Sequence, residues 1–354
     1  MTVPLVSARA RRVHRDAIVV DMHNDMITKV LDDAYDPDVR HSAGFATGDG
    51  QTDLPRLVES GITAQFLAAW VDAPYGCIPG ASHDRAMEYV RAIDAFVARH
   101  PDHLLAARTA ADVRRAKTED KVAIFTALEG GHAIEGSLER LREFHALGVR
   151  YLTLTWNNGT DWAGSSIGVG DTSTGGLSGF GRAVIREMNR LRMLVDLSHV
   201  SESTFHDALA ESVAPVVVSH SCARALNDHV RNVRDDQVRA VAQGGGVVNV
   251  NFYARFLDPN FEESQRTGHP TPFGVLVDHV DHLVQVGGVD HVGLGSDFDG
   301  VSALPEGMED VTCLPRLTQA LLDRGYADAH VGKILGGNML RLLEVVFDEK
   351  GRPR

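Results

Sequence analysis

Eight short apolar segments recur along the chain, and amphipathic segments of helical length separate most of them. In the amphipathic segments, apolar residues are spaced three and four positions apart, as they are on one face of a helix. We therefore expect helices at 82–100, 137–149, 180–192 and 235–245. We expect strands at 17–21, 62–70, 122–128, 151–156, 193–197, 215–219, 246–253 and 291–296.

Near-continuous apolar strands that alternate with helices are typical of parallel sheets covered on both faces. Eight such strands predict a (β/α)8 TIM barrel, formed as one domain by residues 1–354. The alternative is a doubly wound open sheet, but that fold more often has a glycine-rich turn after its first strand, where this chain has "DMHND". A closing helix is expected to start near Asn338, and the Gly/Ser-rich segment 163–179 is expected to be an active-site loop.

The composition is that of a globular protein, with 44% hydrophobic and 23% charged residues. The formal net charge of −13 argues against nucleic acid or an anionic membrane as a partner, because both attract basic surfaces. A small-molecule substrate is expected instead. The three cysteines have no paired spacing, and the first residues lack the apolar core of a signal peptide. We therefore expect a cytoplasmic protein.

Metal-binding side chains stand at the ends of five of the predicted strands. In a barrel these strand ends converge on one face, where active sites are built. A single histidine in such a place is more often a structural residue, and a single aspartate more often caps a helix or forms a turn. Recurrence at five strand ends favours a metal site. The residues are His23, Asp25, Glu129, His199, His220 and Asp297.

Imidazole and carboxylate ligands without a thiolate point to Zn²⁺ or another divalent transition metal. Because a tetrahedral catalytic zinc ion uses three protein ligands and a water, this ligand set suits two ions. His23, Asp25 and one oxygen of Glu129 would bind the first ion. The other oxygen of Glu129, with His199 and His220, would bind the second. A hydroxide between ions ~3.5–4 Å apart would be the nucleophile.

Eight motifs follow one another along the chain: "VVDMHNDM", "ALEGGH", "RYLTLT", "DLSHVS", "VVSHSCAR", "RNVRDD", "VNFY" and "GLGSDFDG". In order and spacing they resemble the membrane (renal) dipeptidase family of binuclear zinc hydrolases, in its soluble bacterial form. The resemblance runs from about Arg12 to the closing "GGNMLRLLEVV". It implies a (β/α)8 barrel of the metallo-dependent hydrolase type, usually paired as a homodimer. It also implies cleavage of dipeptides, including those with a D-residue at the C-terminal position.

Residue by residue, the resemblance assigns the same five ligands to two zinc ions, with Glu129 as the bridge. Asp297, which the ligand set leaves over to accept a proton, matches the family's proton-transfer aspartate. Arg231 matches the arginine that binds the substrate's carboxylate, although by itself it would be interpreted as an exposed arginine in a charged loop. Tyr253 matches a tyrosine of the same pocket, although an aromatic residue at a strand end is more often packing.

The chain departs from the family pattern after the fourth predicted strand, where "LTLTWNN" places Trp156 in the position of a histidine. In the family this histidine helps to hold the scissile carbonyl as it becomes an oxyanion. Losing one such donor can cost about 10²–10³ in rate. We therefore expect Trp156 to alter substrate preference more than metal binding. His132, Asn157 and Asn158 lie nearby in sequence and are candidates for a replacement donor.

Two other functions remain open at this point. One is a different barrel metal hydrolase, such as a deaminase, lactonase or phosphotriesterase-like enzyme. Such enzymes typically carry HxH after the first strand, whereas His23 and Asp25 form HxD. The other is a metal-binding protein without turnover, an alternative that Trp156 raises. The complete ligand set and Asp297 favour a zinc-dependent dipeptidase over both.

Overall fold

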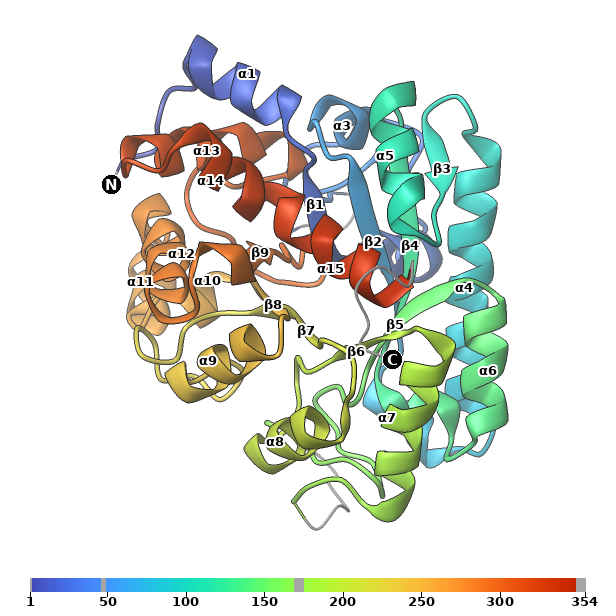
Figure 1. Ribbon diagram of the computed structural model, residues 1–354. Helices are drawn as coiled ribbons and strands as arrows, with labels where there is room; N and C mark the ends of the chain where they lie inside the picture. The colour runs from blue at the N-terminus through green and yellow to red at the C-terminus, as the bar shows by residue number, and fades with distance from the viewer. Residues whose placement is uncertain (1, 46–48, 169–174, 348–354) are drawn as a thin grey trace.

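Eight parallel strands close into a barrel, with helices arranged around it (Figure 1). The computed structural model describes residues 2–45, 49–168 and 175–347. Around the ring the strands follow in the order β1, β2, β4, β5, β6, β7, β8 and β9, and β9 pairs with β1. The chain is therefore the (β/α)8 barrel that its hydrophobic pattern predicts. The barrel strands are β1 (Val20–Asn24), β2 (Ala64–Trp70), β4 (Val122–Glu129), β5 (Val149–Thr153), β6 (Leu194–Asp196), β7 (Val217–Ser221), β8 (Val247–Val250) and β9 (Val292–Leu294).

One further strand, β3 (Leu104–Ala106), lies outside the ring, and the hydrophobic pattern does not predict it. It pairs with residues 122–124 of β4, whereas β5 pairs with residues 126–129 of the same strand. Because β2 occupies the other edge of β4, β3 and β5 follow each other along a single edge. A strand of three residues is too short to show a period of two in the sequence.

Helices connect the successive strands and cover the outside of the barrel (Figure 1). Several begin at a serine whose side chain accepts a backbone N–H, such as Ser178 before α7 and Ser201 before α8. The helices are α1 (Ala8–Asp16), α2 (Met26–Asp32), α3 (Leu54–Glu59), α4 (Ala81–Arg99), α5 (Ala110–Glu119), α6 (Leu138–Ala146), α7 (Gly179–Leu191), α8 (Glu202–Glu211), α9 (Asp235–Gln243), α10 (Ala254–Leu257), α11 (Phe261–Thr267), α12 (Phe273–Gly287), α13 (Leu314–Asp323), α14 (Asp328–Gly332) and α15 (Asn338–Phe347).

Apolar side chains fill the barrel interior as well as the layer between strands and helices. Inside the barrel, the ring of Phe66 stacks on that of Phe125 with centroids 4.5 Å apart, next to Tyr151. Helix α15 covers the amino-terminal end of the barrel, where Phe347 lies against Phe125 at 6.3 Å and neighbouring residues pack on Val20. The carboxyl-terminal end is left for polar side chains.

All eight predicted strands are present, with their ends shifted by a few residues. The largest shift is at β1, which begins at Val20 and continues through His23. The strand can pass through Asp21 because hydrogen bonds satisfy this buried carboxylate. Ser296 donates to it through its backbone nitrogen at 2.8 Å and its hydroxyl at 2.6 Å, and Gln65 donates at 3.0 Å. The sequence pattern does not contain these partners, so it ends the strand too early.

The four predicted helices correspond to α4, α6, α7 and α9, and α15 starts at Asn338 as expected. Strand β5 ends at Thr153, so Trp156 lies in the loop that follows instead of in the predicted strand. The Gly/Ser-rich segment 163–179 comes next. Its residues 169–174 lie outside the described ranges, whereas Ile167 borders the cavity at the carboxyl-terminal end of the barrel.

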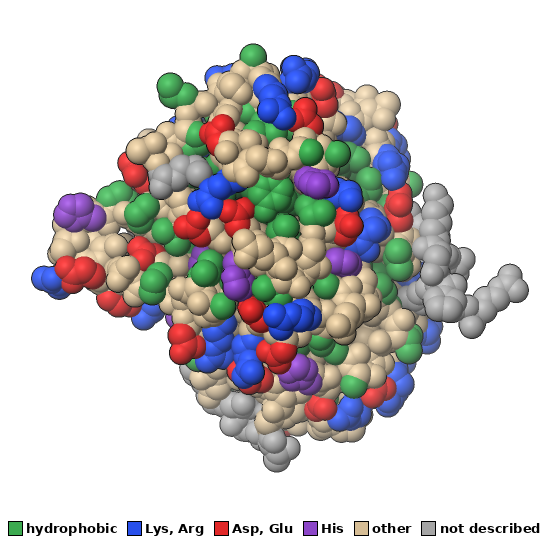
Figure 2. All heavy atoms as spheres, turned by 60° about the vertical axis from the view of Figure 1, so that its left-hand side comes forward, with side chains coloured by type: hydrophobic (Ala, Val, Ile, Leu, Met, Phe, Trp, Pro, Cys, Tyr) green, Lys and Arg blue, Asp and Glu red, His purple; other side chains and the backbone are tan. Residues whose placement is uncertain are grey.

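The surface carries charges of both signs. On the face that Figure 2 shows, basic and acidic side chains of the described residues lie intermixed, with histidine and apolar side chains between them. None of the helices described is both long enough and apolar enough to cross a membrane.

Candidate active site

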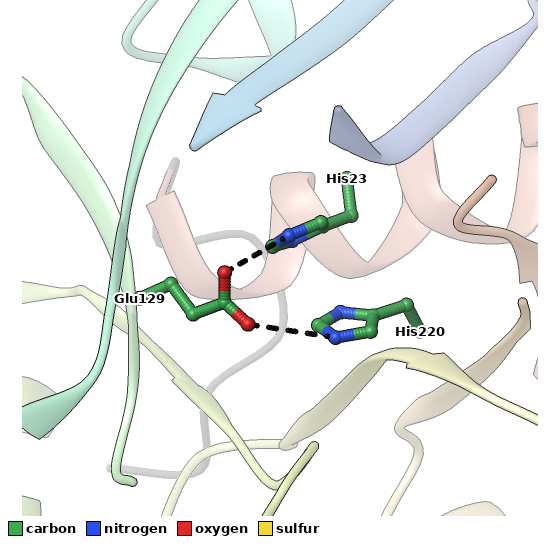
Figure 3. A group of neighbouring side chains, drawn as sticks. All are labelled: His23, Glu129 and His220. Atoms are coloured by element: carbon green, nitrogen blue, oxygen red, sulfur yellow. Dashed lines mark ion pairs between the residues drawn. The ribbon is translucent and has the colours of Figure 1, made fainter. Parts of the chain in front are cut away.

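Three of the predicted ligands meet at the centre of the carboxyl-terminal end of the barrel (Figure 3). His23 lies in β1, Glu129 is the last residue of β4, and His220 lies in β7. The Nε2 atom of His23 lies 3.2 Å from Oε2 of Glu129, and Nε2 of His220 lies 3.6 Å from Oε1. The two imidazoles therefore lie next to different oxygens of one buried carboxylate.

The remaining predicted ligands extend this cluster on both sides. His199, in the loop after β6, places its Nε2 2.9 Å from Oε1 of Glu129 and 3.0 Å from Nε2 of His220. Asp25 follows β1 directly, and its Oδ2 lies 3.3 Å from Nε2 of His23. The arrangement divides into a group of His23, Asp25 and Oε2 and a group of His199, His220 and Oε1. The possible ligand atoms lie within 4.8 Å of one another in two groups: His23, Glu129 and His220, and His23, Asp25 and Asp297.

Hydrogen bonds fix the ring orientation of His23. The hydroxyl of Tyr151 donates its proton to the carbonyl oxygen of Met22 at 3.1 Å and lies 2.6 Å from Nδ1 of His23. It therefore accepts a hydrogen bond from Nδ1, which carries a proton. The Nε2 atom is buried, has no hydrogen-bond partner among the residues that the structure describes, and faces the carboxylates of Asp25 and Glu129.

The other two imidazoles are oriented in the same way. The hydroxyl of Ser219 donates to Asp196 at 2.6 Å, so it accepts from Nδ1 of His220 at 2.8 Å. Nδ1 of His199 lies 3.2 Å from Oδ1 of Asn157, which can only accept. Each histidine thus uses Nδ1 for an outer partner and turns Nε2 toward Glu129. Outer partners of this kind commonly orient metal-binding histidines.

This convergence fits a divalent metal. The Nε2 electron pairs of three buried imidazoles face one another and a carboxylate, and electron pairs in such proximity repel unless a cation lies between them. Imidazole nitrogen and carboxylate oxygen are suitable ligands for a divalent transition metal. The residues present therefore match, in type and in direction, what a metal ion at this position would need.

The protonation of the cluster fits the same interpretation. Burial lowers the pKa of His199 to about 4 and the pKa of His220 well below its usual value, which keeps both rings neutral. Although burial opposes ionisation of Glu129, the neighbouring imidazoles of His23 and His199 lower the pKa of this carboxyl group well below its usual value. Neutral His199 and His220 beside an ionised Glu129 are in the forms that bind a metal. Although burial opposes it, the neighbouring Tyr151, Glu129 and Asp25 raise the pKa of His23 well above its usual value.

Asp297 stands beside Asp25 and His23, and the possible ligand atoms of the three lie within 4.8 Å of one another. Asn251 donates to Oδ2 of Asp297 at 2.7 Å. Asp297 has a φ of 63°, in the left-handed region that few non-glycine residues adopt. A side chain at Gly300 would collide with the carboxylates of Asp25 and Asp297, so only glycine fits there. Burial, together with the charge of Asp25, raises the pKa of Asp297 to about 7.

The sequence profile of the membrane dipeptidase family, peptidase family M19, matches residues 7–351. The chain belongs to this family. It is therefore a metal-dependent hydrolase of peptide bonds that acts on small peptides, and the cluster around Glu129 is the candidate metal centre of this dipeptidase.

Solved structures of similar proteins agree with this assignment. Dipeptidase AC, a metallo peptidase of family M19, is 31% identical with a TM-score of 0.82, over 94% of this chain and 99% of its own. A metallo peptidase from Rhodobacter sphaeroides, liganded with a phosphinate mimic of the dipeptide L-Ala-D-Ala, is 31% identical with a TM-score of 0.79, over 94% and 100%. An amidohydrolase from Pseudomonas aeruginosa is 25% identical with a TM-score of 0.78, over 96% and 99%.

Arg231 of this dipeptidase is buried, in contrast to the exposed arginine that its charged sequence context would indicate. Its guanidinium group lies 5.3 Å from the ring of Phe256 and makes long hydrogen bonds to Ser221 and to the carbonyl oxygen of His220, at 3.5 and 3.4 Å. Among the described residues no carboxylate pairs with it, and its Nε has no partner. Burial lowers its pKa to about 10. A buried cation without a counter-ion is suited to bind an anionic group.

A cavity of about 380 Å³ opens over the cluster, and all the candidate substrate residues border it. Tyr253 lies on the side of Arg231, where its ring packs against Phe256 at 4.8 Å. Trp156 lies on another side, where its ring packs edge-to-face against Trp70 at 5.0 Å. The structure thus places Arg231, Tyr253 and Trp156 around one cavity.

His132 does not lie in position to replace the family's histidine. Its Nε2 lies 3.0 Å from the carbonyl oxygen of Val71, an acceptor, so this nitrogen carries a proton that is already used. The side chain borders a second cavity, on the far side of Trp156, instead of the cavity over the metal ligands. Of the nearby candidates, Asn157 borders the site, and because its Oδ1 accepts from His199, its NH₂ group is the part of the side chain that can donate. Asn158 borders the second cavity only.

Sequence analysis missed the residues that orient the histidines. Asp196 is satisfied by the hydroxyl groups of Thr153 and Ser219 and by two backbone N–H groups, so it holds Ser219 against His220. Tyr151 does the same for His23 from the opposite side of the barrel interior. The sequence carried no signal for these pairs, because Tyr151 and Asp196 lie on other strands than the histidines that they orient.

Proposed function

We propose that this dipeptidase holds two zinc ions and cleaves dipeptides, including those with a D-residue at the C-terminal position. His23, Asp25 and Glu129 would hold one ion; Glu129, His199 and His220 would hold the other. The observation that carries this proposal is the convergence of three Nε2 electron pairs on the two oxygens of one buried carboxylate. When bound, such ions polarise a carbonyl group and make a hydroxide nucleophile available at neutral pH.

The chain's own residues would bind and orient the substrate. Arg231 would bind the C-terminal carboxylate, because its buried guanidinium faces the cavity without a carboxylate partner among the described residues. A bidentate guanidinium–carboxylate pair would also fix the direction of the peptide. Tyr253 would border the bound C-terminal residue from the same side. This placement brings the peptide bond over Glu129 and the histidines.

Asp297 would move the proton. It lies next to Asp25 and borders the cavity, and Asn251 holds one of its oxygens. In this position its carboxylate would accept the proton of the attacking water and return it to the nitrogen of the leaving amine. The close approach of Gly300 and the hydrogen bond from Asn251 support a side chain that is held in one orientation.

Tolerance of a D-residue is supported by the Rhodobacter sphaeroides relative, whose ligand is a mimic of L-Ala-D-Ala. We also propose a homodimer of single-domain chains, on the basis of the family resemblance. Light scattering on the purified protein would measure the mass of the assembly and would contradict the dimer if it gave the mass of one chain.

The decisive experiment is hydrolysis of a panel of L–L and L–D dipeptides by the purified protein, with added zinc and again after chelation. We expect cleavage of both kinds of dipeptide, loss of cleavage on chelation, and recovery when zinc is restored. Metal analysis of the same samples should give two zinc ions per chain. A folded, zinc-loaded protein that cleaves no member of the panel would contradict the proposal and would favour a metal-binding protein without turnover.

Substitution Tyr151→Phe should weaken zinc binding without removing a ligand. The variant leaves Nδ1 of His23 and the carbonyl oxygen of Met22 without their shared partner. Substitution of a residue that hydrogen-bonds to a metal ligand typically lowers metal affinity about 10–100-fold, and we expect a loss of zinc affinity in this range. Calorimetric titration of the metal-stripped protein with zinc would measure it. Tyr89→Phe is the matched control, because Tyr89 is equally buried but donates to Asp32, away from the site. Equal zinc affinities in the two variants would contradict the role of Tyr151.

A further inference from the structure

Two cavities meet at Trp156. The cavity over the metal ligands has a volume of about 380 Å³, and a second cavity, open to the surface, has a volume of about 880 Å³. Trp156 and Asn157 border both of them. Beyond these two residues, the second cavity is bordered by side chains such as Ile78, Pro79 and Trp162. Trp156 therefore forms a partition between the substrate site and the larger second cavity.

The partition has a defined position. The indole of Trp156 packs edge-to-face on Trp70, with centroids 5.0 Å apart and planes at 71°. The carbonyl oxygen of Trp156 accepts a hydrogen bond from the hydroxyl of Ser165 at 2.7 Å. The next residue, Asn157, is held by His199 at 3.2 Å. These contacts fix the backbone at Trp156 and one face of its ring.

The partition lies across the barrel from Arg231. Trp70 ends β2, Trp156 follows β5, and these two strands flank β4 in the ring. Arg231 follows β7, which flanks β8, and β8 is the strand opposite β4 in a ring of eight. A dipeptide held by its carboxylate at Arg231, with its peptide bond over Glu129, therefore directs its first residue toward the two tryptophans.

We propose that Trp156 sets the size of the N-terminal residue that this enzyme accepts, by closing the substrate site off from the second cavity. This inference rests on the proposed dipeptidase function. The wall formed by Trp70, Trp156 and Ile167 presents aromatic and aliphatic surface to the site, so apolar first residues of moderate size are preferred. A first residue as large as tryptophan collides with the partition.

The test uses dipeptides that share a C-terminal D-alanine and differ in the first residue: glycine, alanine, leucine, phenylalanine and tryptophan. The zinc-loaded wild-type protein should cleave the leucine substrate with a kcat/KM at least about tenfold above that for the tryptophan substrate, a typical discrimination by an apolar pocket. A flat profile across the series would overturn the proposal, even without any variant.

Substitution Trp156→Ala should join the two cavities. We expect the ratio of kcat/KM for the tryptophan substrate to that for the alanine substrate to rise by about tenfold or more. A second series, with alanine first and a varied C-terminal residue, should keep its wild-type profile, because that residue lies on the side of Arg231. An unchanged ratio in the first series would contradict the partition, as would equal changes in both series.

Substitution Trp156→Phe distinguishes the role of Trp156 as a partition from a role as a hydrogen-bond donor. It replaces the alanine variant in the test if that variant does not fold. A phenylalanine keeps an aromatic wall of smaller size, so the ratio should lie between those of the wild type and Trp156→Ala. An equal loss of about 10²-fold for all substrates would instead assign the indole N–H to the scissile carbonyl and overturn the proposal. If the wild type cleaves no dipeptide, the proposed function fails and this inference with it. Cleavage without size discrimination defeats this inference alone.

Discussion

Replacing Glu129 with glutamine is expected to remove bound zinc and dipeptide hydrolysis together. The carboxylate lies between Nε2 of His23 at 3.2 Å and Nε2 of His199 at 2.9 Å. A glutamine has one oxygen and an NH₂ group in place of two anionic oxygens, so it cannot join two cations. Substitution of a residue that only hydrogen-bonds to a ligand lowers metal affinity about 10–100-fold, and we expect a larger loss of zinc affinity here. Metal analysis and calorimetric titration of the purified variant would measure it.

The control for this variant is Glu139→Gln, which makes the same chemical change on the exposed surface of α6. It should retain its zinc content and its rate of hydrolysis. Zinc should also raise the thermal unfolding temperature of the wild type and of the control but not that of Glu129→Gln, because only a folded state that binds the ion is stabilised by it. A Glu129→Gln protein that keeps two zinc ions would exclude Glu129 as the bridge.

Substitution Asp297→Asn is expected to lower kcat strongly while leaving zinc in place. The asparagine occupies the same volume beside Asp25 but cannot accept a proton from water. Loss of a general acid–base group typically costs about 10²–10⁴-fold in rate, and we expect kcat to fall within this range with little change in KM. Steady-state kinetics on an L–D dipeptide, together with metal analysis of the same sample, would test this.

The combined measurement separates two roles for Asp297, because its carboxylate is also close enough to His23 and Asp25 to be a metal ligand. Loss of zinc together with activity would make Asp297 a ligand. Wild-type turnover in the variant would remove both roles. Asp228→Asn is the control: Asp228 is an exposed acidic residue whose carboxylate pairs with Arg224 outside the site, and its substitution should change neither zinc content nor rate.

The barrel could be predicted from local sequence, because a strand that is covered on both faces must be apolar at nearly every position. Local sequence was insufficient for β3 and for the start and end of β1, where the deciding partners are distant in sequence. Asp21 is an example: its carboxylate can be buried in the barrel only because Ser296 donates two hydrogen bonds to it. The hydrophobic pattern along the chain therefore predicts that the strand ends at Asp21.

The candidate site shows a similar division. The ligand types were visible because His23, Asp25 and Glu129 stand where apolar strands end, and strand ends of a barrel share one face. The orientation of the imidazoles could not be predicted from the sequence. The ring of His23 is oriented by Tyr151 from another strand, and the ring of His220 is oriented by Ser219, which donates in turn to Asp196. Hydrogen-bond direction is a property of atoms in space, and spacing in the sequence does not encode it.

By itself, the sequence determined the (β/α)8 architecture, the candidate metal-binding side chains and, through its motifs, the family. Only the tertiary structure decided that Arg231 is a buried cation without a carboxylate partner among the described residues, and that His132 lies behind Trp156. The physical reason is the range of the interactions. Burial of strands follows from the residues within each strand, whereas the burial of Arg231 and the shape of the cavity follow from loops that fold together from separate parts of the chain.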